Sequence, residues 1–202
     1  MGVAQRAGWQ PEDLARAFMD GGARCLQIRA KELSSGRLLD LCDTITAAAR
    51  PYSAVVIVND RPDMAMMSNA SGVHVGQDDF PPAHIRRLLG PAAVIGFSTH
   101  TREQIERAAD EPVDYIAIGP VFGTRTKETG YEAVGLSQVA DAARRSNGLP
   151  VVAIGGITLD RAASVWSAGA SSVAVISDLL AGGDPAGRVR AFLQMAASVT
   201  RL

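Results

Sequence analysis

The sequence has little cysteine, no marked excess of charge and no long apolar run. Its only cysteines, Cys25 and Cys42, stand in apolar segments. Two thiols make no disulfide framework, and we expect both to be buried and free. Twenty basic residues stand against 21 acidic ones, for a net charge of -1, so no general field attracts nucleic acid. No stretch approaches the roughly 20 apolar residues of a membrane helix, and no signal peptide is visible. We therefore expect a cytoplasmic protein that binds neither nucleic acid nor membrane.

What the sequence does contain is a regular alternation of two patterns. The chain is 47% hydrophobic, which suffices for the core of a single domain over residues 1–202. Short apolar runs recur, and because they are almost continuously apolar they are typical of parallel strands covered on both faces. The runs lie at 25–30, 54–60, 72–76, 93–99, 115–119, 151–156 and 172–177.

Helical patterns separate these runs. Pro11, followed by two acidic residues, opens a helix that ends at a glycine pair at 21–22. Apolar residues three to four positions apart predict a second helix over 38–49. Thr101 and Gln104 form a capping box for a third. Such alternation of strand and helix is compatible with a doubly wound sheet or with a closed (β/α)₈ TIM barrel.

We predict the α/β TIM barrel, with its first strand missing or truncated. The helix at Pro11 has no convincing strand before it, because residues 1–5 are few and weakly β-forming. An open barrel would leave two strand edges and an uncovered core. We therefore expect the natural chain to begin upstream of Met1. The alternatives are that the N-terminal residues pair as a short strand or that another chain closes the gap, and an incomplete barrel favours a homo-oligomer.

Catalytic residues of such barrels lie at the carboxyl ends of the strands. The run at 25–30 and the residue after it carry Gln27, Arg29 and Lys31, which strand alternation places on one face. Two cations in a barrel mouth favour a phosphate or pyrophosphate partner. The alternative is a structural ion pair with a nearby carboxylate.

Acidic residues follow the next two runs. Asn59 and Asp60 end one of them, and Asp78 and Asp79 follow the other. Two carboxylates facing a basic cluster suit Mg²⁺ that also binds substrate phosphate oxygens. Alternatively, Asp60 forms a loop-capping salt bridge with Arg61, or Asp79 caps the next segment. For Asp78 we favour a place outside the site.

The loop at 119–130 offers donors for an anion. Thr124 and Thr126 alternate with other residues and are followed by Lys127. Such a loop can close over an anionic ligand, and the alternative is an ordinary solvated surface loop.

The last two runs end in small residues. Gly155 and Gly156 end one run, and Ile176 and Ser177 end the other. Glycine lets backbone N–H groups approach a ligand, and a helix that begins there adds its positive end, so we expect a phosphate monoester here. Alternatively, the glycine pair only relieves crowding at the barrel rim.

Two histidines stand on or near strand ends. His74 lies within a strand, and we expect a packed ring that supports the site from behind. His100 follows Ser98 and Thr99, so it either lines the mouth or makes a cap or loop contact.

In order and spacing, seven segments resemble the thiamine phosphate synthase family over residues 10–200. That family joins 4-amino-5-hydroxymethyl-2-methylpyrimidine diphosphate to 4-methyl-5-(2-hydroxyethyl)thiazole phosphate and releases pyrophosphate. The resemblance therefore implies an enzyme, a Mg²⁺-dependent transferase of thiamine biosynthesis. The segments are QIRAK at 27–31, NDRPD at 59–63, GVHVGQDD at 72–79, IGFSTH at 95–100, GPVFGTRTK at 119–127, AIGGI at 153–157 and VAVIS at 173–177.

The resemblance also implies roles for individual residues. Arg29, Lys31, Ser98 and Lys127 would be catalytic in a dissociative reaction, in which pyrophosphate leaves before the thiazole nitrogen attacks. Asp60 and Asp79 would hold Mg²⁺. The pyrimidine diphosphate would contact Gln27, Arg29, Lys31, Asn59, Ser98 and Lys127, and the thiazole phosphate would contact Thr124, Thr126, Gly156, Ile176 and Ser177.

Two other functions stay open. A thiazole tautomerase-like isomerase of the same fold binds a related thiazole but would not need the carboxylates Asp60 and Asp79. A non-catalytic protein that binds phosphate ligands would result if the missing strand abolishes turnover.

Overall fold

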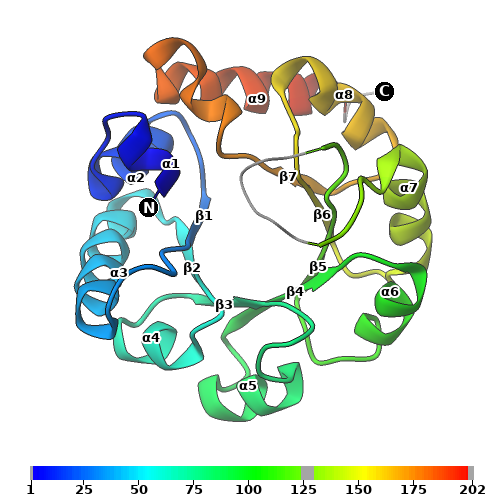
Figure 1. Cartoon of the computed structure of the whole chain (residues 1–202), viewed down its shortest axis with the longest axis horizontal. Helices are drawn as coiled ribbons and strands as arrows, with labels where there is room; N and C mark the ends of the chain where they lie inside the picture. The colour runs from blue at the N-terminus through cyan, green and yellow to red at the C-terminus, as the bar shows by residue number, and fades with distance from the viewer. Residues whose placement is uncertain (1, 124–129, 200–202) are drawn as a thin grey trace.

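The computed structural model describes residues 2–123 and 130–199. Its seven strands form one parallel sheet in sequential order, which curls into the wall of a barrel (Figure 1). Each predicted run contains one strand, and most strands end one or two residues before the run does. The strands are β1 Cys25–Ile28, β2 Val55–Asn59, β3 Gly72–Val75, β4 Val94–Thr99, β5 Tyr115–Ile118, β6 Val151–Ile154 and β7 Ser172–Ala174.

The helices form a layer outside the strands (Figure 1). The predicted cap at Thr101 is confirmed, because its hydroxyl accepts a hydrogen bond from the Gln104 N–H. The Gln104 side chain accepts in return from the N–H of His100, one residue before the cap, at 2.7 Å. The described helices are α1 Gly2–Arg6, α2 Pro11–Asp20, α3 Ser35–Ala49, α4 Pro62–Met67, α5 Pro82–Leu89, α6 Arg102–Ala108, α7 Gly135–Arg145, α8 Leu159–Ser167 and α9 Pro185–Val199, with short 3₁₀ helices η1 Arg50–Tyr52 and η2 Asp178–Gly183.

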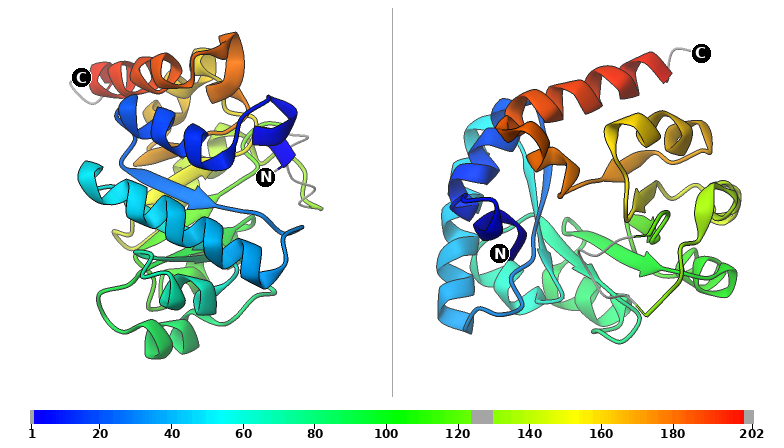
Figure 2. Two further views of the ribbon diagram at one scale, coloured as in Figure 1. Left: turned by 90° about the vertical axis from the view of Figure 1, so that its left-hand side faces the viewer. Right: turned by 45° about the horizontal axis from the view of Figure 1, so that its top comes forward.

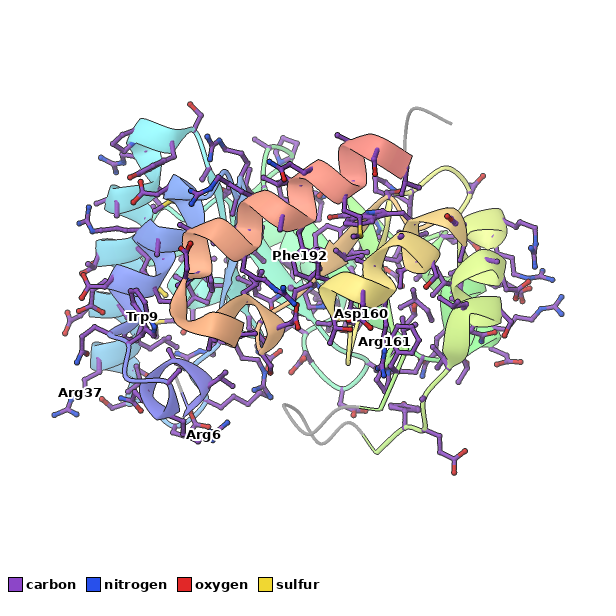
Figure 3. All side chains as sticks on the ribbon, turned by 90° about the horizontal axis from the view of Figure 1, so that it is seen from above. Arg6, Trp9, Arg37, Asp160, Arg161 and Phe192 are labelled. Atoms are coloured by element: carbon purple, nitrogen blue, oxygen red, sulfur yellow. The ribbon has the colours of Figure 1, made fainter. Side chains whose placement is uncertain are left out.

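The main core lies between the strands and the helices. Alternate strand residues, such as Val56, Val58 and Ile116, are fully buried there, as expected for strands with helices on their outer face. Phe192 of α9 points into the same core (Figure 3). Because alternate residues point the other way, the remaining strand side chains face the lumen of the barrel.

The ring of strands stays open between β1 and β7. Within residues 2–123 and 130–199, the hydrogen-bonded ladders join only consecutive strands. The alternative of a short N-terminal strand is wrong, because residues 2–6 form the helix α1 instead. The predicted barrel with seven of its eight strands is confirmed.

Helices cover this opening. α9 packs against α2 and against α8 (Figures 2 and 3). At Gly21, just after α2, an added Cβ would lie 2.5 Å from the Ala186 carbonyl oxygen. A second, small core joins α1, α2 and α9 here, and Leu26 of β1 and Ile176 beyond β7 pack against it; its buried residues are Ala4, Leu14, Phe18 and Val189.

One prediction about the thiols is wrong. Cys42 is buried as expected, but Cys25 is exposed. Cys25 lies on β1, whose outer edge pairs with no strand among the described residues. Its exposure therefore follows from the opening, which the apolar sequence around it does not reveal.

None of the helices described is long and apolar enough to cross a bilayer.

Candidate functional site

The carboxyl ends of β1 and β2 bring a cation and a carboxylate together. Lys31 Nζ lies 2.7 Å from Asp60 Oδ2. The Asp60 backbone has a left-handed φ of 62°, uncommon for a residue with a side chain, and its N–H donates to the His74 carbonyl at 2.8 Å. The alternative salt bridge to Arg61 is wrong, because Arg61 binds Asp63 instead.

Asp79, beyond β3, completes an acidic pair with Asp60. Its Oδ2 accepts the Gly76 N–H at 2.7 Å, so it holds the preceding turn rather than capping the next helix. Burial raises the pKa of the Asp79 carboxyl, and the charge and hydrogen bond of Asp60 raise it further. The hydrogen bond from the Gly76 N–H and the charge of Lys31 lower this pKa, but by less. Two carboxylates in contact repel each other unless a proton or a cation lies between them.

This donor set fits a hard divalent cation. Mg²⁺ takes one or two protein carboxylates and completes its shell with phosphate oxygens and water. Among the described residues, no group of three or more histidine, cysteine or acidic side chains could hold a metal ion. A cation at Asp60 and Asp79 would therefore depend on oxygens from a bound ligand. Asp78 and Asp79 are both exposed, but it is Asp79 that contacts Asp60.

Arg29 and Asn59 lie beside this acidic pair. Ile28 pairs with Val58 in the β1–β2 register, so Arg29 and Asn59 follow at the same level, and both are half-buried. The predicted basic cluster thus gathers at one edge of the mouth. Lys31 forms an ion pair with a nearby carboxylate, which was the alternative to phosphate binding. That carboxylate is Asp60, which is also a predicted metal ligand.

Inside the lumen, His74 joins three strands. Its Nε2 lies 2.7 Å from the Ser98 hydroxyl of β4, and its Nδ1 lies 2.9 Å from the Tyr115 hydroxyl of β5. The His74 and Tyr115 rings stack, with centroids 5.5 Å apart. Burial raises the pKa of the Tyr115 phenol, and a hydrogen bond from Gln27 of β1 opposes this. Gln27 and Ser98, predicted on separate strands, are thereby connected.

Gly96 makes room for these rings. A Cβ at this position would lie 2.1 Å from Tyr115 Cζ and 2.4 Å from His74 Nδ1. Neither Gly96 nor Tyr115 was among the predicted site residues. A glycine in the middle of an apolar strand was the available signal, because it often marks a close approach of other groups.

Gln77 was also missed. Its side-chain N–H donates to the Ser98 carbonyl at 2.7 Å. The loop after β3 is therefore fastened to the end of β4, and the Ser98 backbone is held on one side while His74 holds its hydroxyl.

On the opposite side of the mouth, the glycine pair packs against the loop after β5. Gly155 and Gly156 have φ values of 100° and 63°. An added Cβ would lie 2.6 Å from Pro120 Cα at the first and 2.6 Å from the Gly123 carbonyl oxygen at the second. Both glycines therefore relieve crowding at the rim, and contact of Gly156 with a phosphate stays a prediction. Thr124, Thr126 and Lys127 lie outside the described residues.

His100 fastens the described parts of that loop. Its Nδ1 hydrogen-bonds the Gly119 carbonyl, and its ring stacks on Tyr131 with centroids 3.9 Å apart. The loop-contact interpretation of His100 is confirmed.

Beyond β7, Ser177 is exposed and immediately precedes η2. The neighbouring Asp178 accepts the Leu159 N–H at the start of α8 and binds Arg188 at 2.8 Å. The Ile176 side chain packs against the small core under α9. The segments that follow Gly156 and Ser177 are thus joined by the hydrogen bond from the Leu159 N–H to Asp178.

Comparison with known proteins identifies clear similarities. The family model described as thiamine monophosphate synthase matches residues 4–179. The thiamine-phosphate synthase of Roseiflexus castenholzii is 40% identical over 185 residues, 92% of this chain and 81% of that protein. The one from Anaeromyxobacter dehalogenans is 43% identical over 178 residues, 88% of this chain and 79% of that protein.

Solved structures agree. The thiamine phosphate pyrophosphorylase from Pyrococcus furiosus matches with a TM-score of 0.87 and 29% identity, over 94% of this chain and 91% of that one. The N-(5'-phosphoribosyl)anthranilate isomerase of the same organism, at 14% identity and a TM-score of 0.68 over 92% of this chain and 94% of its own, shares the fold alone.

Proposed function

The chain belongs to the thiamine monophosphate synthase family and catalyses formation of thiamine phosphate, and we propose that it does so by the Mg²⁺-dependent condensation of 4-amino-5-hydroxymethyl-2-methylpyrimidine diphosphate with 4-methyl-5-(2-hydroxyethyl)thiazole phosphate. The observation that carries this proposal is the contact of Lys31, Asp60 and Asp79 at three neighbouring strand ends. A cation beside a carboxylate pair is the arrangement that a metal-bound diphosphate needs.

In the proposed reaction, the diphosphate leaves first. Asp60 and Asp79 would hold Mg²⁺, which when bound neutralises charge on the leaving pyrophosphate. Arg29, Lys31 and Lys127 bind its oxygens, and their positive charges stabilise the negative charge that grows as the CH₂–O bond breaks. The remaining pyrimidine contacts are Gln27, Asn59 and Ser98.

The second substrate binds on the other side of the mouth. The thiazole phosphate would be anchored by the backbone at Gly156 and by Ser177, with Ile176, Thr124 and Thr126 beside it. Holding the phosphate places the thiazole nitrogen against the pyrimidine carbon that has lost pyrophosphate, so positioning lowers the barrier to attack.

The carboxylate pair also bears on the two other functions. An isomerase acting on a thiazole product, or a protein that only binds phosphate ligands, does not require Asp60 and Asp79 in contact. Their contact therefore favours the transferase. A cytoplasmic location and a homo-oligomeric state stay predictions.

The test is pyrophosphate release from the two substrates, with and without Mg²⁺. Asp79→Asn should lower the rate at least about 100-fold, because it removes one metal ligand. The matched control is Asp78→Asn, which removes an equal charge from the neighbouring exposed residue and should retain most activity. Release that does not depend on metal, or equal rates for the two variants, would remove Asp79 from the proposed metal site.

A further inference from the structure

We propose that His74 is a positioning residue that turns the Ser98 hydroxyl into a hydrogen-bond donor toward the substrate. The proposal rests on the proposed function only in placing Ser98 against the pyrimidine diphosphate. It follows from a chain of contacts across the lumen. Gln27 of β1 lies near Tyr115 of β5, whose hydroxyl contacts His74 of β3, and His74 contacts Ser98 of β4.

The direction of the hydrogen bonds follows from the chemistry of the groups. A neutral imidazole has one nitrogen that donates and one that accepts. A phenol O–H is a stronger acid than the N–H of a neutral imidazole, and a neutral imidazole nitrogen is the better acceptor, so the preferred hydrogen bond runs from the Tyr115 O–H to Nδ1. The proton of the ring must then lie on Nε2, which donates to the Ser98 oxygen.

The Ser98 proton is thereby left for the ligand. A hydroxyl has one proton, and once its oxygen accepts from His74, that proton can be directed elsewhere. An oxygen that gains negative charge as pyrophosphate leaves is the partner that such a donor stabilises most. In the opposite arrangement, with the proton on Nδ1, Ser98 would donate to His74 and could only accept from the substrate.

The surrounding structure fixes this network. The His74 carbonyl accepts a hydrogen bond from the Asp60 N–H at 2.8 Å. The backbone of His74 therefore positions Asp60, while its ring binds Tyr115 and Ser98. Gly96 leaves the space in which the two rings meet. The Gln27 side chain lies near the Tyr115 hydroxyl and acts to lower the pKa of the phenol, as an N–H directed at the phenol oxygen does. A donor at that oxygen leaves the phenol proton for His74.

Kinetics separate positioning from general stability. Tyr115→Phe keeps the ring but removes the hydroxyl, and we expect kcat to fall about tenfold, the effect of losing one hydrogen bond, while KM for thiazole phosphate is unchanged. His74→Asn, whose amide cannot reach the Nε2 position, should lose a similar factor. His74→Gln can place an N–H near the Ser98 oxygen and should recover part of the rate.

A double-mutant cycle tests whether His74 acts through Ser98. In a Ser98→Ala background, His74→Asn should change kcat by less than about twofold. A full tenfold loss there, or equal rates for His74→Asn and His74→Gln, would overturn the proposal. His84→Gln, an exposed substitution on α5, is the control and should leave kcat unchanged.

The hydrogen-bond direction is read by ¹⁵N NMR of the ligand-free chain. We expect His74 to show a protonated Nε2 in the wild type and to lose this preference in Tyr115→Phe, with assignment from the signal missing in His74→Gln. A protonated Nδ1 in the wild type would overturn the proposal. This arm needs no substrate, so it stands or falls separately from the proposed function, which fails if the wild type releases no pyrophosphate.

Discussion

The two sides of the lumen differ in how their polar groups are held. From β2 to β5 the sheet is continuous, and His74, Ser98 and Tyr115 are tied to one another across adjacent strands. Between β7 and β1 no ladder is described, and the lumen-side residues Cys25 and Ser172 are exposed. We call β2 to β5 the closed side and the gap between β7 and β1 the open side. Hydrogen bonds between adjacent strands fix the side chains of the closed side, as an accurately positioned reaction centre requires, whereas the open side depends on packing between helices.

This difference assigns separate roles to the two sides. Departure of pyrophosphate requires donors fixed against a growing charge. Of the proposed donors that the structure describes, Arg29 and Lys31 follow β1 and Ser98 lies on β4. The open side is built by α2, α9 and the small core around Leu14 and Phe18, against which Ile176 packs, so its stability depends on packing between helices. Gln27 belongs to the edge strand β1 but reaches the network through Tyr115, so it links the two sides.

The largest loss of activity should come from filling the space at Gly96 on the closed side. Gly96→Ala places a Cβ 2.1 Å from Tyr115 Cζ, which must displace the Tyr115 and His74 rings. We expect kcat to fall at least about 100-fold, together with about 1–3 kcal/mol of stability. Pyrophosphate release and chemical denaturation measure both. Gly36→Ala, where a Cβ meets nothing within 4 Å, is the control, and equal activity of the two variants would contradict the assigned role.

Thiol labelling should separate the two sides by accessibility. Cys25 lies exposed on β1, whereas Cys42 is buried. Burial raises the pKa of both thiols, and that of Cys42 rises to about 11. Because the thiolate is the reactive form, we expect an aromatic disulfide reagent to modify Cys25 at least about tenfold faster. Cys25→Ser should remove the fast phase and Cys42→Ser should retain it. Equal rates would mean that the opening between β1 and β7 is no more accessible than the core.

Gly21→Ala should weaken the open side while leaving chemistry intact. Its Cβ would lie 2.5 Å from the Ala186 carbonyl oxygen, so α2 and α9 must move apart. We expect a loss of about 1–3 kcal/mol of stability and a change in kcat of less than about twofold at a temperature where the variant is folded. A loss of activity as large as that of Gly96→Ala would show that the two sides are not independent.

The sequence predicted those features that depend on local pattern. Seven apolar runs gave seven strands, and the Thr101 box gave a helix start, because both signals lie within a few residues. Lys31, Asp60 and Asp79 were predicted to meet because the carboxyl ends of parallel strands share one edge. The contact of His74 with Tyr115 and the exposure of Cys25 were not predictable, since both depend on the curvature and closure of the whole sheet.

The smallest effect concerns Asp79 and the stability of the metal-free chain. Its pKa is raised in the folded state, so in the pH range between the unfolded and folded values the folded chain binds more protons. Stability must then fall as pH rises through that range. Asp79→Asn should remove this slope and, at neutral pH without metal, raise Tm by less than about 2 °C, although it abolishes most activity. Thermal melts from pH 4 to pH 7 measure the slope in both proteins, with Asp78→Asn as control. A variant that melts lower than the wild type at every pH would mean that the Gly76 N–H to Asp79 hydrogen bond outweighs the repulsion from Asp60, and the acidic pair would then contribute to the fold as well as to the proposed metal site.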